Sequence, residues 1–402
     1  MKFLSKTKKV ALKGKTVIVR IDLNVEPGRK LDSYRLKAVI PTIHFLRTRG
    51  ARVVLMSHRG YPNLKPKNRL KSLATDWNFD KKNKELSLKP FVKVLSRKLK
   101  ESVFFVPYEK SWLIDKKRFL AKQRESVFLF ENLRFYWGEK TNDMRFAEFL
   151  AGWGDIYVND AFPESHRKVA SIAGVPKYLP SYAGFVLERE IENLGRVMKN
   201  PRRPVTLIMG GAKIVDKIDV IEYLWKKTDA VLLGGGPANT FFAAEGLPMG
   251  DSLVDVSAFP FIREYRDKGK IMLPVDSERF ARADLERILD IGEVTMCWFA
   301  DIIKNSETVI WNGPMGLFEK KGFEKGTIAI WKAIFALAKK NPKARIVVGG
   351  GETVASLRLL KTKNYKLKTK NLFISTGGGA MLDFLSGKKL PGIVALSKTG
   401  KR

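Results

Sequence analysis

The sequence predicts an α/β protein built from two Rossmann-like domains, each with a parallel sheet between two layers of helices. In both halves of the chain, short apolar runs of strand length alternate with stretches of helical periodicity, as in βαβ units. In the second half, five apolar runs end in glycine-rich turns, as expected at the carboxyl edge of a parallel sheet. A chain of 402 residues is long enough for two hydrophobic cores.

The first half contains the following candidates. Strands are expected at residues 16–20, 53–56, 103–106, 127–130 and 156–158, because these short runs are apolar and rich in β-branched or aromatic residues. Helices are expected at residues 36–46, 88–99 and near 144–150, where apolar residues recur at helical spacing. The basic and poorly periodic segment 64–85 is expected to be a surface excursion.

A long helical pattern at residues 188–199 precedes two arginines flanked by Pro201 and Pro204, which indicates a boundary. We therefore expect a first domain at residues 1–185, an interdomain helix and hinge at 186–204, and a second domain at 205–387. The tail, residues 388–402, is expected to pack back on the first domain.

The glycine-rich turns follow the apolar runs that end at Met209, Leu233, Trp311, Val348 and Ile374. Glycine lets the backbone approach a ligand closely, and a helix that begins there presents N–H groups to phosphate oxygens. Any one of these turns alone is equally compatible with a tight strand-to-helix connection. Five of them on one sheet edge favour a phosphate-binding site.

The net charge of +34 comes from 75 Lys and Arg against 41 Asp and Glu, and the basic residues are spread along the whole chain. A nucleic-acid-binding protein usually concentrates such charge on one stripe, so this distribution favours an anionic small ligand, with only nonspecific attraction to polyanions. The chain has neither a Walker motif nor a complete G-x-G-x-x-G fingerprint, which disfavours a dinucleotide dehydrogenase.

Cys297 is the one cysteine, so no internal disulfide can form and a cytoplasmic location is expected. We expect Cys297 to be a small buried residue. The N-terminus lacks the apolar core of a signal peptide, and no stretch is long and apolar enough to predict a membrane span.

Several motifs occur in an order that resembles the phosphoglycerate kinase family along essentially the whole chain. They are VRIDLNV, SHRGYP, FENLRF, YVNDAF, SHRKVAS, GGAKIVDKI, LLGGGPANTF, WNGPMGLFE, GGGET, STGGGA and LPGIVALS. The resemblance implies reversible phosphoryl transfer from 1,3-bisphosphoglycerate to ADP, giving 3-phosphoglycerate and ATP, with Mg²⁺. It also implies a monomer whose two domains close about a hinge.

By this resemblance the first domain binds 3-phosphoglycerate, with Arg35 beside the transferring phosphoryl group. The matching positions are Asp22, Asn24, Arg35, His58, Arg134 and Arg167. Arginine suits both carboxylate and phosphate because its planar fork makes paired hydrogen bonds. The family commonly reads H-L-G-R-P where this chain reads His58-Arg59-Gly60-Tyr61-Pro62. Arg59 is a candidate replacement, and we expect the phosphate contacts to be weakened or rearranged.

The resemblance gives the second domain the nucleotide site, with Lys213 on the transferring phosphoryl group, Lys217 on the nucleotide phosphates and Glu319 on the ribose. Its matching positions are Gly211, Ala212, Lys213, Lys217, Gly235, Gly236, Asn312, Pro314, Leu317, Glu319, Gly350, Gly351, Glu352 and Thr353. Gly351 and Gly378 are expected to act in catalysis through the helices that begin near them. Glu352 stands where the family usually has aspartate, and we expect it to bind the Mg²⁺ of the nucleotide.

The expected chemistry needs no general base because the acceptor carboxylate is already an anion. The protein has to align two anionic substrates and neutralise the developing charge. Lys213 and Lys217 are four residues apart, so we expect them to share one helical face. Two alternatives remain open. One is a catalytically weakened nucleotide-binding relative, suggested by Tyr61 and Glu352, and the other is a basic protein associated with nucleic acid on the same scaffold.

Overall fold

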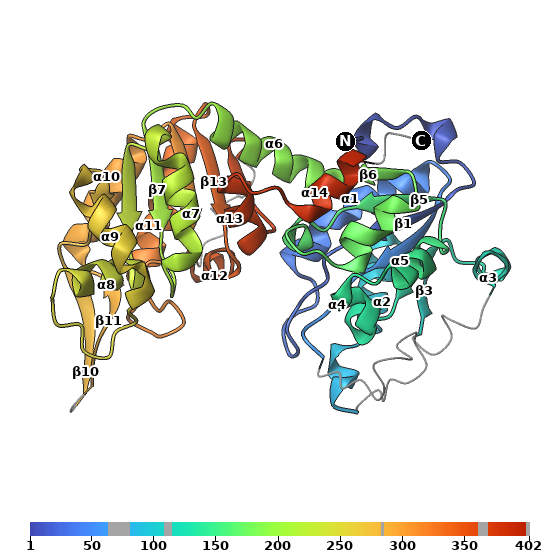
Figure 1. Ribbon diagram of the computed structural model, residues 1–402, viewed down its shortest axis with the longest axis horizontal. Coiled ribbons are helices and arrows are strands. Elements are labelled where there is room, and N and C mark those ends of the chain that lie inside the picture. The colour runs from blue at the N-terminus through green and yellow to red at the C-terminus, as the bar shows by residue number, and fades with distance from the viewer. Residues whose placement is uncertain (63–80, 108–114, 283–284, 361–368, 399–402) are drawn as a thin grey trace. The chain divides into compact units, whose positions relative to one another are not determined.

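A computed structural model describes residues 1–62, 81–107, 115–282, 285–360 and 369–398 of the chain (Figure 1). The structure divides into two compact units. Unit 1 comprises residues 1–190 and 389–402, and unit 2 comprises residues 191–388. Residues 64–80 of the segment predicted to be a surface excursion, 64–85, lie outside the described part of the chain. Residues 361–368, which belong to the basic run 361–370, also lie outside it.

Unit 1 is built on a six-stranded sheet in the order β3-β4-β2-β1-β5-β6, and every neighbouring pair is parallel. Its strands are β1 Thr16–Arg20, β2 Arg52–Met56, β3 Val103–Val106, β4 Val127–Phe130, β5 Ile156–Asn159 and β6 Ser181–Ala183. Its helices include α1 Tyr34–Thr48, α2 Phe91–Leu99, α3 Lys116–Lys122, α4 Trp137–Thr141 and α5 Met144–Ala151. The five strands expected from the sequence are confirmed; the sixth, β6, is too short to show a periodic pattern.

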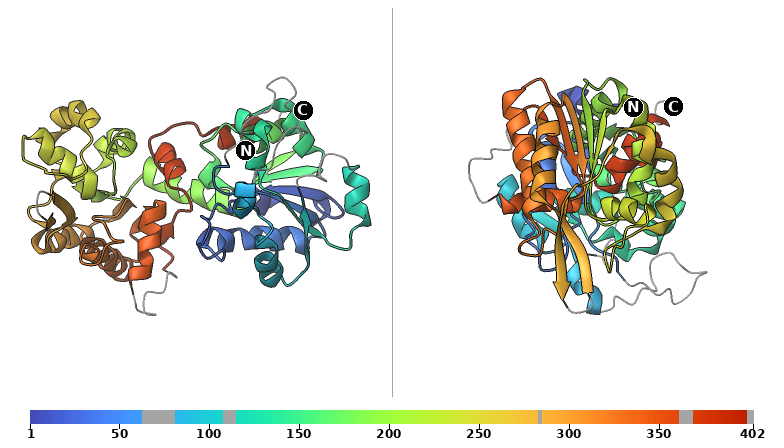
Figure 2. Two further views of the ribbon diagram at one scale, coloured as in Figure 1. Left: turned by 90° about the horizontal axis from the view of Figure 1, so that it is seen from below. Right: turned by 90° about the vertical axis from the view of Figure 1, so that its left-hand side faces the viewer.

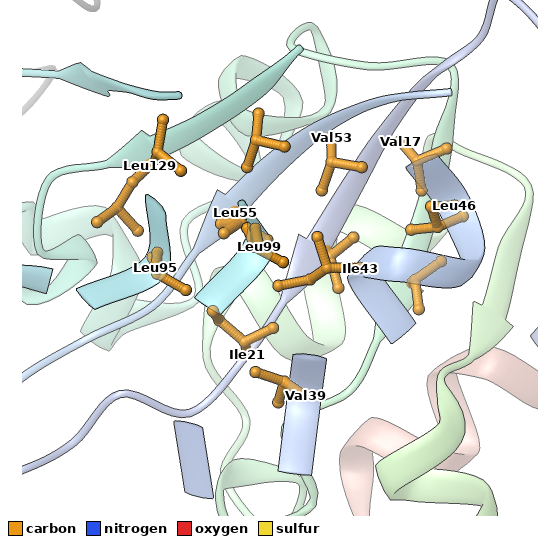
Figure 3. Packing of buried hydrophobic residues seen from close by; sticks show 14 of the residues in the cluster. Val17, Ile21, Val39, Ile43, Leu46, Val53, Leu55, Leu95, Leu99 and Leu129 are labelled. Carbon is orange, nitrogen blue, oxygen red and sulfur yellow. The ribbon is translucent and has the colours of Figure 1, made fainter. Parts of the chain in front are cut away.

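Alternate residues of β1, β2 and β4 point to the two faces of the sheet, and the face that carries Val17, Val53 and Leu129 packs against α1 and α2 (Figure 3). Helix α1 contributes Val39, Ile43 and Leu46 to this core, and α2 contributes Leu95 and Leu99. The strands are buried on both faces. Because they are parallel, their carboxyl ends form one edge of the sheet, where polar side chains follow the apolar strands.

Helix α6, Phe185–Lys199, crosses the division between the two units, which falls after Glu190. Its amino end is held by Asp160, whose Oδ1 accepts hydrogen bonds from the backbone N–H groups of Val186 and Leu187 at 2.7 and 3.4 Å. Burial raises the pKa of the Asp160 carboxyl to about 6.

Near the other end of the chain, helix α14, Pro391–Lys398, packs within unit 1, where the Gly392 N–H donates to the Ser165 carbonyl at 2.9 Å. Residues 399–402 of the tail lie outside the described residues.

Unit 2 contains a second parallel sheet in the order β14-β13-β12-β7-β8-β9. Its strands are β7 Val205–Met209, β8 Ala230–Leu233, β9 Ile271–Met272, β12 Thr308–Asn312, β13 Arg345–Gly349 and β14 Leu372–Ile374. Its helices are α7 Val215–Leu224, α8 Gly235–Ala244, α9 Phe259–Tyr265, α10 Glu293–Lys304, α11 Lys325–Lys340, α12 Gly351–Ser356 and α13 Gly379–Leu385. The strand order reverses between β7 and β12, and ligands bind at such a point in doubly wound sheets.

Unit 2 also has an antiparallel hairpin that the sequence analysis missed, formed by β10 Ser277–Arg282 and β11 Leu285–Ile291. It projects beyond the helices of unit 2 as a pair of orange arrows (Figure 2). Its strands contain adjacent charged residues, Glu278-Arg279 and Glu286-Arg287, so they lack the continuous apolar run of the buried strands.

The expectation that Cys297 is buried is wrong, because this residue is exposed on α10. That helix packs on the core through Met296, Phe299 and Ile303, and Cys297 falls between these positions on the outer face. In the described part of the chain, no helix has the length and apolar character needed to cross a bilayer.

Candidate functional site

In unit 1, loops after β1 and β2 are tied together at the carboxyl edge of the sheet. The Asn24 side-chain oxygen accepts a hydrogen bond from the Gly60 N–H at 2.9 Å, and Asp22 Oδ1 accepts one from the Asn24 N–H at 2.8 Å. The other Asp22 oxygen forms an ion pair of 3.0 Å with Arg35, which comes from the first turn of α1. Asp22 is almost fully buried and Arg35 is partly exposed, so the arginine remains accessible to a ligand.

Glu164 is the centre of a charge cluster at the same edge. One carboxylate oxygen lies 3.3 Å from His58 Nε2, and the other lies 3.2 Å from Arg134 Nη2 and 3.3 Å from Arg167 Nε. Burial alone would raise the pKa of this carboxyl, but His58 and the neighbouring arginines outweigh burial and hold the pKa well below its usual range. The structure therefore brings His58, Arg134 and Arg167 together around a permanently ionised acid.

Arg20, the last residue of β1, completes the cluster and was not among the predicted site residues. It is 1% exposed, and its Nη2 donates to His58 Nδ1 at 2.9 Å. Since arginine can only donate, Nδ1 must accept, so the imidazole proton lies on Nε2 and faces Glu164. Burial lowers the pKa of His58, which agrees with a neutral ring. Arg20 Nε also donates to Ser171 Oγ at 2.9 Å, and that hydroxyl donates to Glu139 at 2.6 Å.

Tyr61 and Arg59 show how the departure from the family motif is accommodated. The Arg59 side chain is buried and donates to the backbone carbonyls of Val25 and Glu85, both at 2.8 Å. Arg59 therefore braces loops, and the expectation that it binds substrate is not supported by its contacts. Tyr61 is 71% exposed and contacts both Arg134 and Arg167.

In unit 2, the predicted glycine-rich turns meet at the carboxyl edge of the sheet. The Gly211 N–H donates to the Pro314 carbonyl at 2.7 Å, and the Gly236 N–H donates to the Gly211 carbonyl at 2.8 Å. A Cβ atom at Gly236 would lie 1.9 Å from the Ala212 carbonyl oxygen, and one at Gly210 would lie 2.1 Å from the Pro314 oxygen. These turns pack backbone against backbone, which only glycine allows.

The two remaining predicted turns lie beside each other. Gly350 has a φ of +95°, and its N–H donates to the Gly377 carbonyl at 3.4 Å. A Cβ atom at Gly378 would lie 3.7 Å from the Gly350 Cα, whereas one at Gly351 would meet nothing within 4 Å. Gly351 therefore has open space beside it at this edge.

Glu352 and Lys217 flank the same edge. The Glu352 carboxylate is exposed and would lie 3.9 Å from a Cβ atom at Gly211. Lys217 is buried; burial lowers the pKa of its ammonium group, and Asp216 and Glu352 oppose this shift. The expectation that Lys213 and Lys217 share a helical face is wrong, because α7 begins at Val215. Lys213 is exposed in the preceding loop, and its carbonyl accepts from Lys217 Nζ at 2.8 Å.

The loop after β12 carries the other predicted nucleotide contacts. Thr353 Oγ1 accepts a hydrogen bond from the Gly313 N–H at 2.8 Å, which joins this loop to α12. Asn312 is buried, and its side-chain nitrogen makes no hydrogen bond to any described residue. Leu317 and Glu319 are exposed. This loop therefore exposes an apolar side chain and an acid, and its Asn312 amide is buried.

Asp290 supports this loop from beneath and was missed by the sequence analysis. Its two carboxylate oxygens accept from the Ile291 and Gly326 N–H groups at 2.9 and 2.8 Å. A Cβ atom at Gly316 or Gly326 would lie 2.3 Å from Asp290 Oδ1, so both glycines lie directly over the carboxylate. Burial, with the nearby Glu278 and Glu324, raises the pKa of Asp290 to about 7.

Comparison with known proteins gives a consistent result. The family model described as "Phosphoglycerate kinase" matches residues 7–388. A phosphoglycerate kinase of Moorella thermoacetica is 41% identical over 413 residues, covering 97% of this chain and 98% of the relative. One from Chloroflexus aggregans is 40% identical, covering 95% and 96%.

Solved structures agree with this result. The phosphoglycerate kinase from Coxiella burnetii has a TM-score of 0.77 at 32% identity, and the one from Pyrococcus horikoshii OT3 has a TM-score of 0.79 at 29% identity. Each comparison covers 99% of both chains.

Proposed function

Because this chain belongs to the phosphoglycerate kinase family, an enzyme family of glycolysis, we propose that it transfers a phosphoryl group reversibly between 1,3-bisphosphoglycerate and ADP. In the reverse direction, a carboxylate oxygen of 3-phosphoglycerate attacks the γ-phosphorus of ATP. The new P–O bond gives the acyl phosphate, and the bond to the β,γ-bridging oxygen breaks to release ADP. The single cysteine and the glycolytic family support a cytoplasmic location for this reaction.

The observation that carries this proposal is the arginine cluster of unit 1. Arg134 and Arg167 share one oxygen of Glu164, so the pair retains positive charge for an anionic substrate. Arg35 provides a further guanidinium group at the Asp22 end of the same edge. We assign 3-phosphoglycerate to this edge, with Arg134 and Arg167 on its phosphate and Arg35 near the carboxylate that receives the phosphoryl group.

The glycine-rich edge of unit 2 is assigned the nucleotide. Backbone N–H groups of these turns suit phosphate oxygens. Asn312 lies buried at the end of β12 beside these turns. Leu317 and Glu319 are exposed beside it, suited to the base and the ribose hydroxyls, respectively. Lys217, held near Glu352, and the exposed Lys213 supply positive charge for the phosphate chain.

The donor set also fits Mg²⁺. The described residues contain no group of three or more His, Cys, Asp or Glu side chains that could enclose a metal ion. Mg²⁺ commonly binds through one or two carboxylates together with substrate phosphates and water, and the exposed Glu352 supplies such a carboxylate. Glu352 would hold the ion, which would neutralise charge on the nucleotide phosphates.

The protein's own residues have two tasks in this reaction. Arg35 and Lys213 stabilise the negative charge that spreads over the transferring phosphoryl group, and no side chain has to remove a proton. The substrates are assigned to different units, and we propose that residues 186–204 act as the hinge about which the two units close during transfer. Exclusion of water would protect the acyl phosphate from hydrolysis. We propose a monomer in which all site residues come from one chain.

A coupled assay with 3-phosphoglycerate, ATP and Mg²⁺ tests the proposal. We expect turnover by the wild-type protein and a drop in kcat of roughly hundredfold for Lys213→Ala, because a charge on the transferring group is lost. Lys226→Ala, which removes an exposed lysine of the same unit, is the control and should retain full activity. A folded wild-type protein without turnover would contradict the proposed function.

A further inference from the structure

Tyr61 is in close contact with two arginines although its side chain is largely exposed. The Arg134 guanidinium carbon lies 4.3 Å from the centre of the Tyr61 ring, within the range of a cation–π contact. Arg167 Nη2 donates to the Tyr61 hydroxyl oxygen at 2.9 Å, and its guanidinium carbon lies 5.9 Å from the ring. Both arginines of the pair therefore contact one exposed tyrosine.

The backbone fixes the ring in this place. Gly60 has a φ of +59°, and a Cβ atom there would lie 2.5 Å from Leu86, so the turn before Tyr61 requires glycine. The Gly60 N–H donates to Asn24, and its carbonyl accepts from Arg134 Nη1 at 2.7 Å. Arg134 is thus bonded to the backbone of the turn and covered by the side chain that follows it.

The two arginines need such support because they carry like charges at close range. Both contact the same oxygen of Glu164, so a single carboxylate holds them from the buried side. Tyr61 holds them from the exposed side, through its ring face for Arg134 and its hydroxyl for Arg167. A further arginine at position 61 would add a third like charge here, whereas tyrosine stabilises the pair without adding one.

We propose that Tyr61 is a substrate-binding and positioning residue for the non-transferring phosphate of 3-phosphoglycerate. This inference rests on the proposed function. The ring keeps the Arg134 guanidinium in one plane, and the hydroxyl holds Arg167. A phenol that accepts from an arginine still has its own O–H to donate, and a phosphate oxygen is a strong acceptor. Tyr61 therefore replaces a charged contact with a neutral donor and an aromatic platform.

The test compares Tyr61→Phe, which keeps the ring and removes the hydroxyl, with Tyr61→Leu, which removes both. We expect the KM for 3-phosphoglycerate to rise about fivefold in the first variant and about twentyfold in the second. The KM for ATP and the thermal midpoint should stay near wild-type values. Tyr178→Phe is the matched control, because Tyr178 is also an exposed tyrosine of unit 1 that donates to a backbone carbonyl.

Calorimetric titration with 3-phosphoglycerate measures the loss of substrate affinity directly and does not require turnover. Weaker binding by both Tyr61 variants, in the order Leu weaker than Phe, supports the inference even if the wild-type protein proves inactive. Unchanged binding by both variants would overturn it while leaving the kinase proposal intact. Equal loss of both substrates together with a lower thermal midpoint would also overturn it, since that result indicates a purely structural role.

Discussion

The two sheet edges of this protein, each a proposed site for an anionic substrate, are built in different ways. In unit 1 the edge is made of side chains: Arg20 and Glu164 are buried and hold His58, Arg134 and Arg167 through ion pairs and hydrogen bonds. In unit 2 the edge is mostly backbone, and a carbon added at Gly210 or Gly236 would clash with a neighbouring carbonyl oxygen. Each edge therefore depends on a different property of the sequence.

This difference predicts how substitutions destabilise each edge. Removing a charge from unit 1 leaves buried partners uncompensated, so the cost is electrostatic. Adding a methyl group to unit 2 forces the backbone apart, so the cost is steric. Substitutions in the two units test this contrast.

Glu164→Ala is expected to have the largest effect. It leaves Arg134 without its buried carboxylate, and breaking a buried pair in this way costs about 3–5 kcal/mol of unfolding free energy. Urea unfolding measures the change. Glu26→Ala is the control: its ion pair with Arg29 is 3.5 Å long and fully at the surface, and such pairs contribute about 0–1 kcal/mol. Equal losses in the two variants would show that the cluster is not a buried network.

Gly236→Ala is expected to destabilise unit 2 by about 1–3 kcal/mol, because its Cβ would meet the Ala212 carbonyl at 1.9 Å. The same shift should weaken ADP binding by about tenfold or more, since these turns form the proposed nucleotide edge. Unfolding and calorimetric titration report the two effects. Normal ADP affinity in this variant would show that the close-packed turns do not form the nucleotide site.

The unfolding free energy of unit 2 should depend on pH because of the buried Asp290. Its pKa is raised by burial to about 7, so the folded protein binds more protons than the unfolded chain between about pH 4 and pH 7. The unfolding free energy should therefore fall as pH rises through this window. In Asp290→Asn this contribution is absent, so urea unfolding at pH 5.5 and pH 8 should show a flatter dependence. Parallel dependences for variant and wild type would contradict the assignment.

Gly195→Ala is expected to have the smallest effect and the opposite sign. Gly195 lies inside α6, and a Cβ atom there would meet nothing within 4 Å. Alanine should stabilise the helix by up to about 1 kcal/mol, because it restricts the unfolded chain and favours helix. Thermal unfolding measures the gain. A loss of stability would mean that the space around a glycine does not predict whether alanine is tolerated there. That result would weaken the argument for Gly236 as well.

The buried strands were predictable because their signal is local. The apolar runs at β1, β3 and β4 match the observed strands residue for residue, and every predicted glycine turn follows a strand of the second parallel sheet. The hairpin of β10 and β11 was missed, since its adjacent charged residues interrupt any alternating pattern. Cys297 was misplaced because the sequence alone did not show which face of α10 packs on the core.

The site was predictable only in part for a similar reason. Arg134 and Arg167 belong to recognisable motifs, but the acid that holds them, Glu164, lies between two quoted motifs and has no periodic signal. Arg20 offered a signal that was not used: an arginine that ends a buried strand needs buried partners. The contacts of Tyr61 depend on loops distant in sequence, so only the structure could show them.

One measurement tests most directly the central claim that two chemically different sites serve two substrates. ADP with Mg²⁺ and 3-phosphoglycerate are titrated separately into the wild-type protein, Arg167→Ala and Gly236→Ala. The account predicts that the wild type binds both ligands, that Arg167→Ala loses affinity for 3-phosphoglycerate by about tenfold while keeping ADP, and that Gly236→Ala does the reverse. A wild-type protein that binds neither ligand, or variants that lose both ligands equally, would contradict it.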